Sequence, residues 1–111
     1  MDNNCIFCKI INGDFNTNFV YENEKLVAFN DINPQAPVHI LFVPKKHIES
    51  LNELNDTMLV KEIYDAIKTV AKEKGISDYR VVLNTGKEAG QEVMHIHFHM
   101  LSGRKLNWPP G

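Results

Sequence analysis

The sequence predicts one α+β domain over residues 1–111, in which a five-stranded, mostly antiparallel sheet carries one long and one short helix. Five short apolar segments have the composition of strands, and most connections between them are too short for parallel crossovers. One longer segment repeats its apolar residues at helical spacing, which predicts a helix that covers the sheet. A chain of 111 residues can bury a core without disulfides.

The first half of the chain is expected to contain a short helix and three strands. Apolar residues in segment 5–11 recur at the spacing of a short amphipathic helix. Segments 19–22 and 25–30 predict two strands that form a hairpin. Two prolines in the loop 31–37 exclude regular pairing there, and the strongly apolar segment 38–43 predicts a central strand.

The second half is expected to begin with the long helix. Asp56 has the position of an N-cap, and the apolar periodicity continues to a stop at Gly75. Residues 79–83 predict a strand, and a glycine-bearing loop covers 84–92. The last strand is predicted over 95–101.

Composition and charge narrow the class of protein. With 43% hydrophobic and 23% charged residues the chain has an ordinary globular composition, and a net charge of -2 predicts no attraction to nucleic acid or to membrane surfaces. No apolar run approaches the roughly 18 residues of a membrane span. The polar start at 1–4 predicts no signal peptide, so we expect a cytoplasmic or nuclear location with Cys5 and Cys8 reduced.

Three histidines alternate with apolar residues at His95, His97 and His99. A strand places them on one face, roughly 6.5–7 Å apart, where they can line one small anionic ligand. Gly86 and Gly90 in the preceding loop allow main-chain N–H groups to approach a phosphate. The pattern therefore predicts covalent catalysis at a phosphoryl centre by a histidine nucleophile.

The residues alone leave other interpretations open. The three histidines are also compatible with an unoccupied surface face or with a zinc site like that of carbonic anhydrase. The spacing of Cys5 and Cys8 suits two thiolates on one metal, but also two buried cysteines. His39, on the central strand, is also compatible with a core histidine whose hydrogen bonds are satisfied.

Segment 95–101 resembles the signature of the histidine triad nucleotide-binding family, His-X-His-X-His-X-X with apolar X. Segments 31–37, 43–47, 90–93 and 108–111 resemble the Hint branch, in the same order and spacing. The resemblance implies a five-stranded antiparallel sheet with two helices. It also implies a homodimer in which the two sheets join into one layer of ten strands.

The resemblance further implies purine nucleoside phosphoramidase activity, the hydrolysis of the P–N bond in adenosine or guanosine 5′-phosphoramidates. His97 would be the nucleophile that forms a nucleotidyl-histidine intermediate, His99 would hydrogen-bond the phosphate, and His39 would orient or tune the nucleophile. A non-catalytic purine nucleotide-binding module and a dinucleoside polyphosphate hydrolase are the alternatives. The segment 108–111 argues against the second of these.

Binding roles also follow from the resemblance. Asp31 matches the ribose ligand, and Asn84 would contact the phosphate or the sugar. The residues that would flank the purine are Phe7, Ile10, Phe29 and Ile32, and those that would wrap the α-phosphate are Gly90, Gln91, Glu92 and Val93. Glu92 departs from the serine that helps the leaving group in many Hint proteins, and it brings a negative charge close to the phosphate.

Other branches of the family bind structural zinc with residues that match Cys5, Cys8, His47 and His95. The resemblance thus implies a Cys2His2 zinc site that ties the N-terminal helix to the sheet. The tail 106–111 carries the single tryptophan, Trp108, followed by two prolines. In Hint-like proteins this tail reaches toward the active site of the partner subunit.

Overall fold

The computed structural model describes residues 4–111, so residues 1–3 of the predicted polar start lie outside the described residues. The elements in chain order are α1 (Ile6–Ile11), β1 (Tyr21–Glu22), β2 (Leu26–Asn30), β3 (Val38–Pro44), the 3-10 turn η1 (Leu51–Glu53), α2 (Thr57–Glu73), β4 (Arg80–Val82), the 3-10 turn η2 (Lys87–Ala89) and β5 (Phe98–Ser102). Within the described part, no helix has the length and apolar character needed to cross a membrane.

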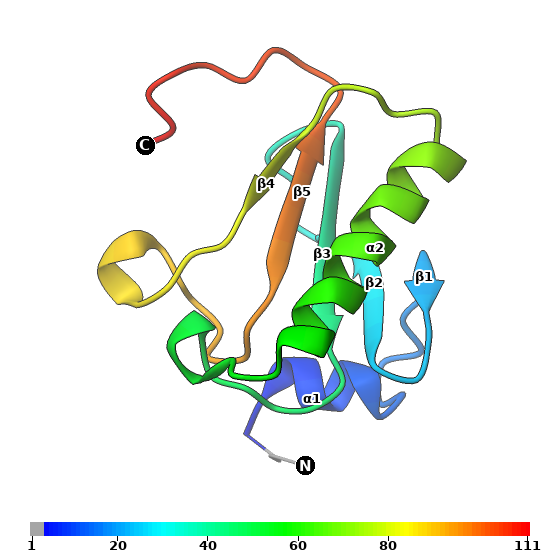
Figure 1. Cartoon of the computed structure of the whole chain (residues 1–111), viewed down its shortest axis with the longest axis vertical. Coiled ribbons are helices and arrows are strands. Elements are labelled where there is room, and N and C mark those ends of the chain that lie inside the picture. Colours follow the sequence, from blue (N-terminus) through cyan, green and yellow to red (C-terminus); the bar gives the residue numbers. More distant parts are fainter. Residues whose placement is uncertain (1–3) are drawn as a thin grey trace.

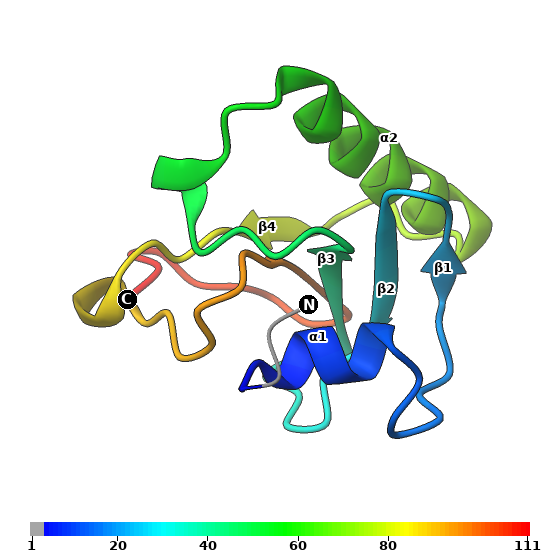
Figure 2. The same ribbon diagram turned by 90° about the horizontal axis from the view of Figure 1, so that it is seen from below.

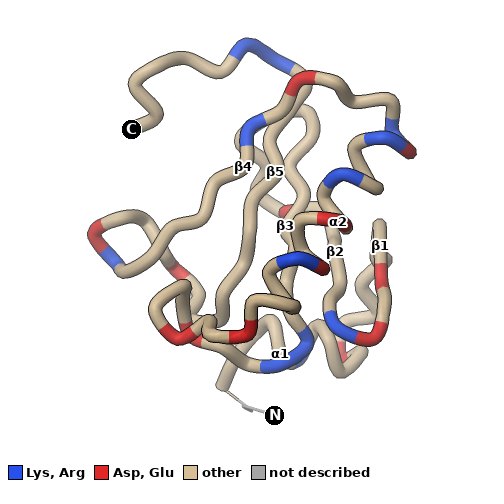
Figure 3. Tube along the Cα trace, viewed as in Figure 1, with Lys and Arg blue, Asp and Glu red and all other residues tan. Residues whose placement is uncertain are grey.

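The five strands form one sheet in the order β1-β2-β3-β5-β4, and every neighbouring pair is antiparallel. The two helices lie on opposite faces of this sheet, α2 on one side and α1 on the other (Figures 1 and 2). This confirms the predicted α+β class with one long and one short helix. Charged residues follow the helices and loops, whereas the described strands β3 and β5 carry none (Figure 3).

The α2 face is an apolar core. The Asp56 carboxylate accepts from the N–H groups of Met58 and Leu59 at 3.0 and 3.3 Å, which confirms the predicted N-cap. From the sheet, Leu26, Ala28, Ile40, Phe42 and Met100 face this core, and from α2 come Leu59, Ile63, Ala66, Ile67, Val70 and Ala71. The helix ends before Gly75, whose φ of 67° is the left-handed conformation typical of helix termini.

The α1 face has a second buried cluster. Its sheet residues are Val27, Phe29, Leu41 and Val43, and α1 with its N-cap contributes Cys5, Phe7 and Cys8. Because β2 and β3 are covered on both sides, their sequences are nearly continuous apolar runs. The site described below lies on this face.

Four predicted strands are shorter than expected: 25–30 and 79–83 lose one residue or two at their ends, and the first and last predicted strands begin later by two residues or more. The first has strand pairing at Tyr21–Glu22 rather than over 19–22, and the last begins at Phe98 rather than His95. The segment before Phe98 forms different bonds: the N–H of Ile96 donates to the carbonyl of Ile48 at 2.7 Å. His95 and His97 therefore reach the α1 face from an irregular segment and not from a regular strand.

Candidate active site and metal cluster

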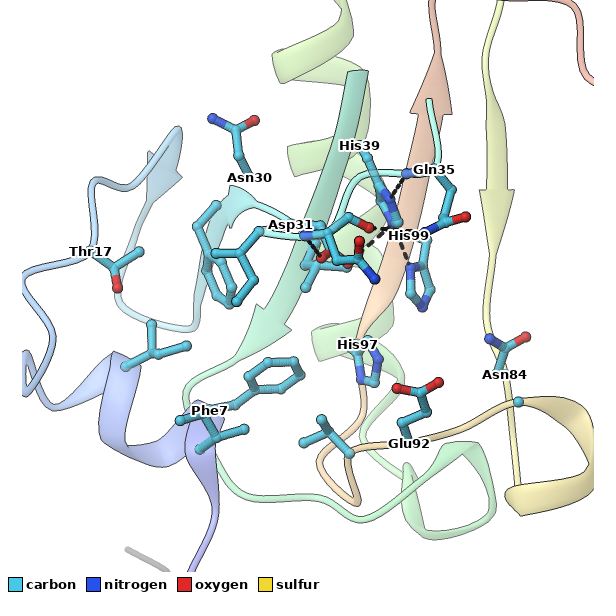
Figure 4. A pocket seen from close by; sticks show the side chains of 18 residues that line it. Phe7, Thr17, Asn30, Asp31, Gln35, His39, Asn84, Glu92, His97 and His99 are labelled. Atoms are coloured by element: carbon cyan, nitrogen blue, oxygen red, sulfur yellow. Dashed lines mark hydrogen bonds and ion pairs between the residues drawn. The ribbon is translucent and has the colours of Figure 1, made fainter. Parts of the chain in front are cut away.

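A cavity of about 680 Å³ opens on the α1 face, where β2, β3 and the start of β5 come together (Figure 4). Its lining consists of Ile6, Phe7, Ile10, Thr17, Phe29, Asn30, Asp31, Ile32, Asn33, Gln35, His39, Leu41, Asn84, Gly90, Glu92, Val93, His97 and His99. The volume is in the range of small-molecule sites, and the apolar side chains are concentrated on one side of the histidines. The cavity can therefore accept a ligand with one flat apolar part and one polar part.

The tautomer of His97 follows from its hydrogen bond. Its Nδ1 lies 2.8 Å from the main-chain oxygen of His95, and a carbonyl oxygen can only accept, so Nδ1 carries the proton. Burial holds the pKa of His97 below its usual value, against the opposing effects of that bond and of Asp31. In the neutral ring, Nε2 has a free lone pair, which is the requirement for a nucleophile.

The opposite tautomer follows for His99. The N–H of Gln35 donates to Nδ1 of His39 at 3.0 Å, so the proton of neutral His39 is on Nε2. That Nε2 donates to Nδ1 of His99 at 2.9 Å, which leaves Nε2 of a neutral His99 as an N–H donor. The two triad histidines of the pocket thus differ: His97 presents a lone pair and His99 presents a proton.

Burial also sets the charge of these rings. It lowers the pKa of His99 to about 4, and the neighbouring His97 and His39 add to the effect. Burial lowers the pKa of His39 as well, although Asp31 opposes it with a carboxylate oxygen 3.5 Å from Nε2. The other oxygen of Asp31 accepts from the N–H of Asn33 at 2.8 Å, which fixes the carboxylate at the pocket wall.

The structure assigns His39 a different neighbour from the one expected. The resemblance implied that His39 orients or tunes the nucleophile His97. Its Nε2 contacts His99, and the tautomer of His97 is set by the His95 carbonyl, so the effect of His39 on His97 is electrostatic: after burial, it helps to hold the pKa of His97 below its usual value. Sequence reasoning also missed Gln35, whose main-chain N–H fixes the His39 tautomer. The proline-rich loop gave no residue-level signal for this bond because a main-chain donor is independent of side-chain type.

The predicted nucleotide-binding residues collect in one place. Phe7, Ile10, Phe29, Asp31, Ile32, Asn84, Gly90, Glu92 and Val93 line the pocket together with the two histidines. Gln91 does not: its side chain is buried, and its amide nitrogen donates to the carbonyl oxygens of Glu49 and Val93. Its main-chain N–H already donates to Gly86 at 3.1 Å, so Gln91 shapes the loop instead of wrapping a phosphate.

A second group of polar residues lies beside the pocket. One ligand atom from each of Cys5, Cys8, His47 and His95 lies within 4.8 Å of the others, so these residues can hold a metal ion. His95 Nδ1 lies 3.3 Å from Cys5 Sγ and 3.6 Å from Cys8 Sγ, and His47 Nδ1 lies 3.3 Å from Cys8 Sγ.

His95 has the tautomer that a metal ligand needs. Its Nε2 lies 2.8 Å from the carbonyl oxygen of Pro44 and must donate, which leaves the Nδ1 lone pair facing the two sulfurs. Burial lowers the pKa of His95 to about 4, so the ring is neutral near pH 7. The expectation that all three triad histidines line one ligand is therefore wrong, because His95 faces the cysteines.

Comparison with known proteins agrees with this geometry. A family model described as "Scavenger mRNA decapping enzyme C-term binding" matches residues 4–107. A maize protein named "14 kDa zinc-binding protein" is 47% identical over 99% of this chain and 90% of its own length. An Arabidopsis thaliana protein named "Adenylylsulfatase HINT1" is 41% identical over 99% of this chain and 78% of its own length.

A solved structure shows the same fold. The HIT family hydrolase from Legionella pneumophila superposes with a TM-score of 0.91 at 46% identity, covering 96% of this chain and 99% of that one. By sequence and by structure, the chain belongs to the histidine triad (HIT) family.

Proposed function

We propose that this protein hydrolyses purine nucleoside 5′-phosphoramidates through a nucleotidyl-histidine intermediate on His97. The observation that carries the proposal is the pair of opposite tautomers in one cavity, a lone pair on His97 and an N–H on His99. A phosphoryl centre between them would meet a nucleophile and a donor to one of its oxygens. The solved relative named as a HIT family hydrolase supports this reaction class.

The proposed reaction has two steps. In the first, the Nε2 lone pair of His97 bonds to phosphorus, the P–N bond of the substrate breaks, and the amine leaves with that electron pair and takes up a proton. In the second, water attacks phosphorus, the bond to Nε2 breaks, and the nucleoside monophosphate departs with a proton released. In both steps His99 donates its Nε2–H to a phosphoryl oxygen.

The pocket wall supports a nucleoside on the apolar side of the histidines. Phe29 and Ile32 line the cavity, and Ile32 is fully exposed in this chain, so a purine would cover apolar surface that is now open to water. Asp31 can accept from both ribose hydroxyls with its remaining lone pairs. Asn84 and Glu92 stand across the cavity, where the phosphate and the amine would lie (Figure 4).

The test is direct. We expect adenosine 5′-phosphoramidate to give AMP and free amine, and we expect acid-quenched mixtures to contain protein heavier by one AMP moiety, located on His97 by peptide mass spectrometry. A dinucleoside polyphosphate and an adenylyl sulfate serve as comparison substrates, the latter because of the name of the Arabidopsis relative. Binding of AMP without turnover of any substrate would identify a nucleotide-binding module instead.

We also propose that the metal is zinc. With bonds of about 2.3 Å to sulfur and about 2.0 Å to nitrogen, a tetrahedral zinc places these ligands about 3.5 Å apart. Three of the four sulfur–nitrogen distances among Cys5, Cys8, His47 and His95 are 3.3, 3.3 and 3.6 Å. The maize relative that is named as zinc-binding supports the same metal. Purified protein should contain about one zinc per chain, and its melting temperature should fall on chelation.

A homodimer is the third part of the proposal. Trp108 is 80% exposed in this chain, and Arg80 holds the start of the tail by donating to the carbonyls of Leu106 and Asn107 at 3.3 and 3.1 Å. A partner subunit would cover the ring and place it beside the leaving-group side of the neighbouring pocket. Deleting residues 106–111 should then alter preference among amine leaving groups and leave AMP affinity within a few-fold. Light scattering that gives a monomer at micromolar concentration would contradict the dimer.

A further inference from the structure

The group Cys5, Cys8, His47 and His95, called the metal cluster below, meets the pocket at the irregular segment before β5. His95 is a member of the cluster, and His97, two residues further on, lines the pocket. Strand β5 begins at Phe98, so both histidines precede its paired residues, and the main chain between them is held by the bond from the N–H of Ile96 to the carbonyl of Ile48. The orientation of the His97 ring therefore depends on contacts outside the sheet.

Two such contacts lead back to the cluster. The first is the bond from Nδ1 of His97 to the main-chain oxygen of His95, at 2.8 Å. The second is the ring of Phe7, which meets the His97 ring edge-on, with centroids 4.9 Å apart and an interplanar angle of 83°. Phe7 also packs edge-on against His95, at 5.9 Å, so one ring touches both histidines.

The position of Phe7 is itself tied to the metal ligands. Phe7 lies in α1 between the two cysteines, and the sulfur of Cys5 caps the helix by accepting from the N–H of Cys8. A metal bound to both sulfurs and to His95 would join the first turn of α1 to the segment that carries the nucleophile. Phe7 is buried, so its ring has little freedom once α1 is held.

We infer that the metal cluster holds His97 in its attacking orientation, with Phe7 as the positioning residue that connects the two. The inference rests on the proposed role of His97 as nucleophile. His99 provides a contrast within the same pocket, because its Nδ1 is held by His39, and His39 by the N–H of Gln35. Loss of the metal should therefore disturb His97 and spare His99.

The first experiment compares zinc-loaded and chelated full-length protein by nitrogen-15 NMR of the histidine rings, which distinguishes the two neutral tautomers. In the loaded protein, His97 should show a proton on Nδ1, and His99 should show one on Nε2. After chelation the His97 signals should shift toward a mixture of tautomers, while the His39 and His99 signals keep their positions. A folded, metal-free protein with unchanged His97 signals would overturn the inference.

The second experiment keeps the metal and changes the connection. Phe7→Leu removes the aromatic edge and keeps an apolar side chain, and it should bring the same change in the His97 signals with zinc still bound. We expect kcat to fall about tenfold, and by a larger factor than AMP affinity. Phe19→Leu is the matched control. Phe19 packs on Phe29, with ring centroids 6.4 Å apart, in the buried apolar cluster of the α1 face.

The two variants decide the inference even if chelation unfolds the protein. Equal effects of Phe7→Leu and Phe19→Leu on the His97 signals would show general loosening of the α1 face and would overturn the role of Phe7. The NMR result does not depend on turnover. If wild-type protein cleaves no phosphoramidate, the proposed function fails while the link between the cluster and His97 is still measured.

Discussion

The two faces of the sheet are built from the same strands but bury different chemistry. In β3, Ile40 and Phe42 face α2 and join an apolar core, whereas His39 faces the other side. In β5, Met100 belongs to the core and His99 to the pocket. Side chains alternate between the two faces along each strand, so core residues and pocket residues are neighbours in the sequence. A substitution at a core position should change stability, whereas one at the next position should change activity.

The faces also differ in how they are stabilised. The α2 face consists of apolar side chains, for which shape and volume decide the free energy of unfolding. The α1 face buries imidazoles, which need hydrogen-bond partners. Within residues 4–111 every fully buried side-chain nitrogen and oxygen has such a partner. On the α1 face, removing a hydrogen-bond partner of a buried imidazole should therefore lower stability as much as removing side-chain volume does on the α2 face.

The largest effect is expected from His97→Ala. Loss of the nucleophile should lower kcat by about 10⁴. AMP affinity should stay within a few-fold, and the melting temperature should fall, because the buried ring packs on Phe7 and donates to the carbonyl of His95. Turnover of a phosphoramidate, AMP titration and thermal unfolding measure the three quantities. A variant that keeps a tenth of wild-type kcat would exclude the covalent mechanism.

Ile96→Ala tests the other face one residue away. Ile96 is 1% exposed in the α2 core, so its truncation should lower the free energy of unfolding by about 2–5 kcal/mol. Well below the melting temperature, kcat should stay within about threefold of wild type if the faces act separately. Ile96→Val is the graded control, with a cost of about 0.5–1.5 kcal/mol. A drop in kcat as large as that of His97→Ala would refute the separation of the faces.

Sequence reasoning succeeded where a residue's role follows from its immediate neighbours. Asp56 as an N-cap and the stripe of apolar residues in α2 are local signals, and the structure confirms both. The apolar run 38–43 indicated a central strand, and β3 indeed lies between β2 and β5 in the sheet. The alternating histidines drew attention to the correct stretch of chain because imidazoles at every second position are rare in a purely structural strand.

It failed where tertiary contacts override a local period. Residues 95–97 have the alternation of a strand, yet they form an irregular segment because His95 turns to the cysteines and Ile96 donates to Ile48. The choice of His99 over His97 as the partner of His39 depends on the register between β3 and β5, in which Leu41 lies opposite His99. Register between distant strands cannot be read from one sequence without contact information.

An intermediate effect is expected from pH. Burial lowers the pKa of His99 to about 4 in the fold, with His97, His39 and Asp31 as its charged or titratable neighbours, whereas the unfolded chain has an ordinary value of about 6.5. The unfolded state therefore binds the proton first, and stability should decrease as pH falls from about 6.5 to about 4. In His99→Gln the free energy of unfolding should fall less over this pH range, by on the order of 1 kcal/mol. The difference is this small because the ring is only partly buried and solvent screens its charge.

Denaturant unfolding at a series of pH values, with metal content checked at each, measures this difference. Comparison of wild type with His99→Gln isolates the contribution of His99 from the acid-sensitive metal ligands, which both proteins share. Identical slopes would show that His99 is solvated in the fold and that its ring is not held neutral by burial.

The smallest effect is expected at the start of α2, far from the pocket. The carboxylate of Asp56 satisfies the N–H groups of Met58 and Leu59, so Asp56→Ala should lower the free energy of unfolding by about 1 kcal/mol. Asp65→Ala, which removes an exposed pair with Lys61 at 2.7 Å, is the matched control on the same helix and should lower stability by less than Asp56→Ala does, because solvent screens the pair. Both variants should keep kcat, AMP affinity and metal content unchanged, since α2 reaches the site only through the sheet. If Asp56→Ala lowered kcat while Asp65→Ala did not, a change at the first turn of α2 would affect the active site on the opposite face of the sheet. The two faces would then not act separately.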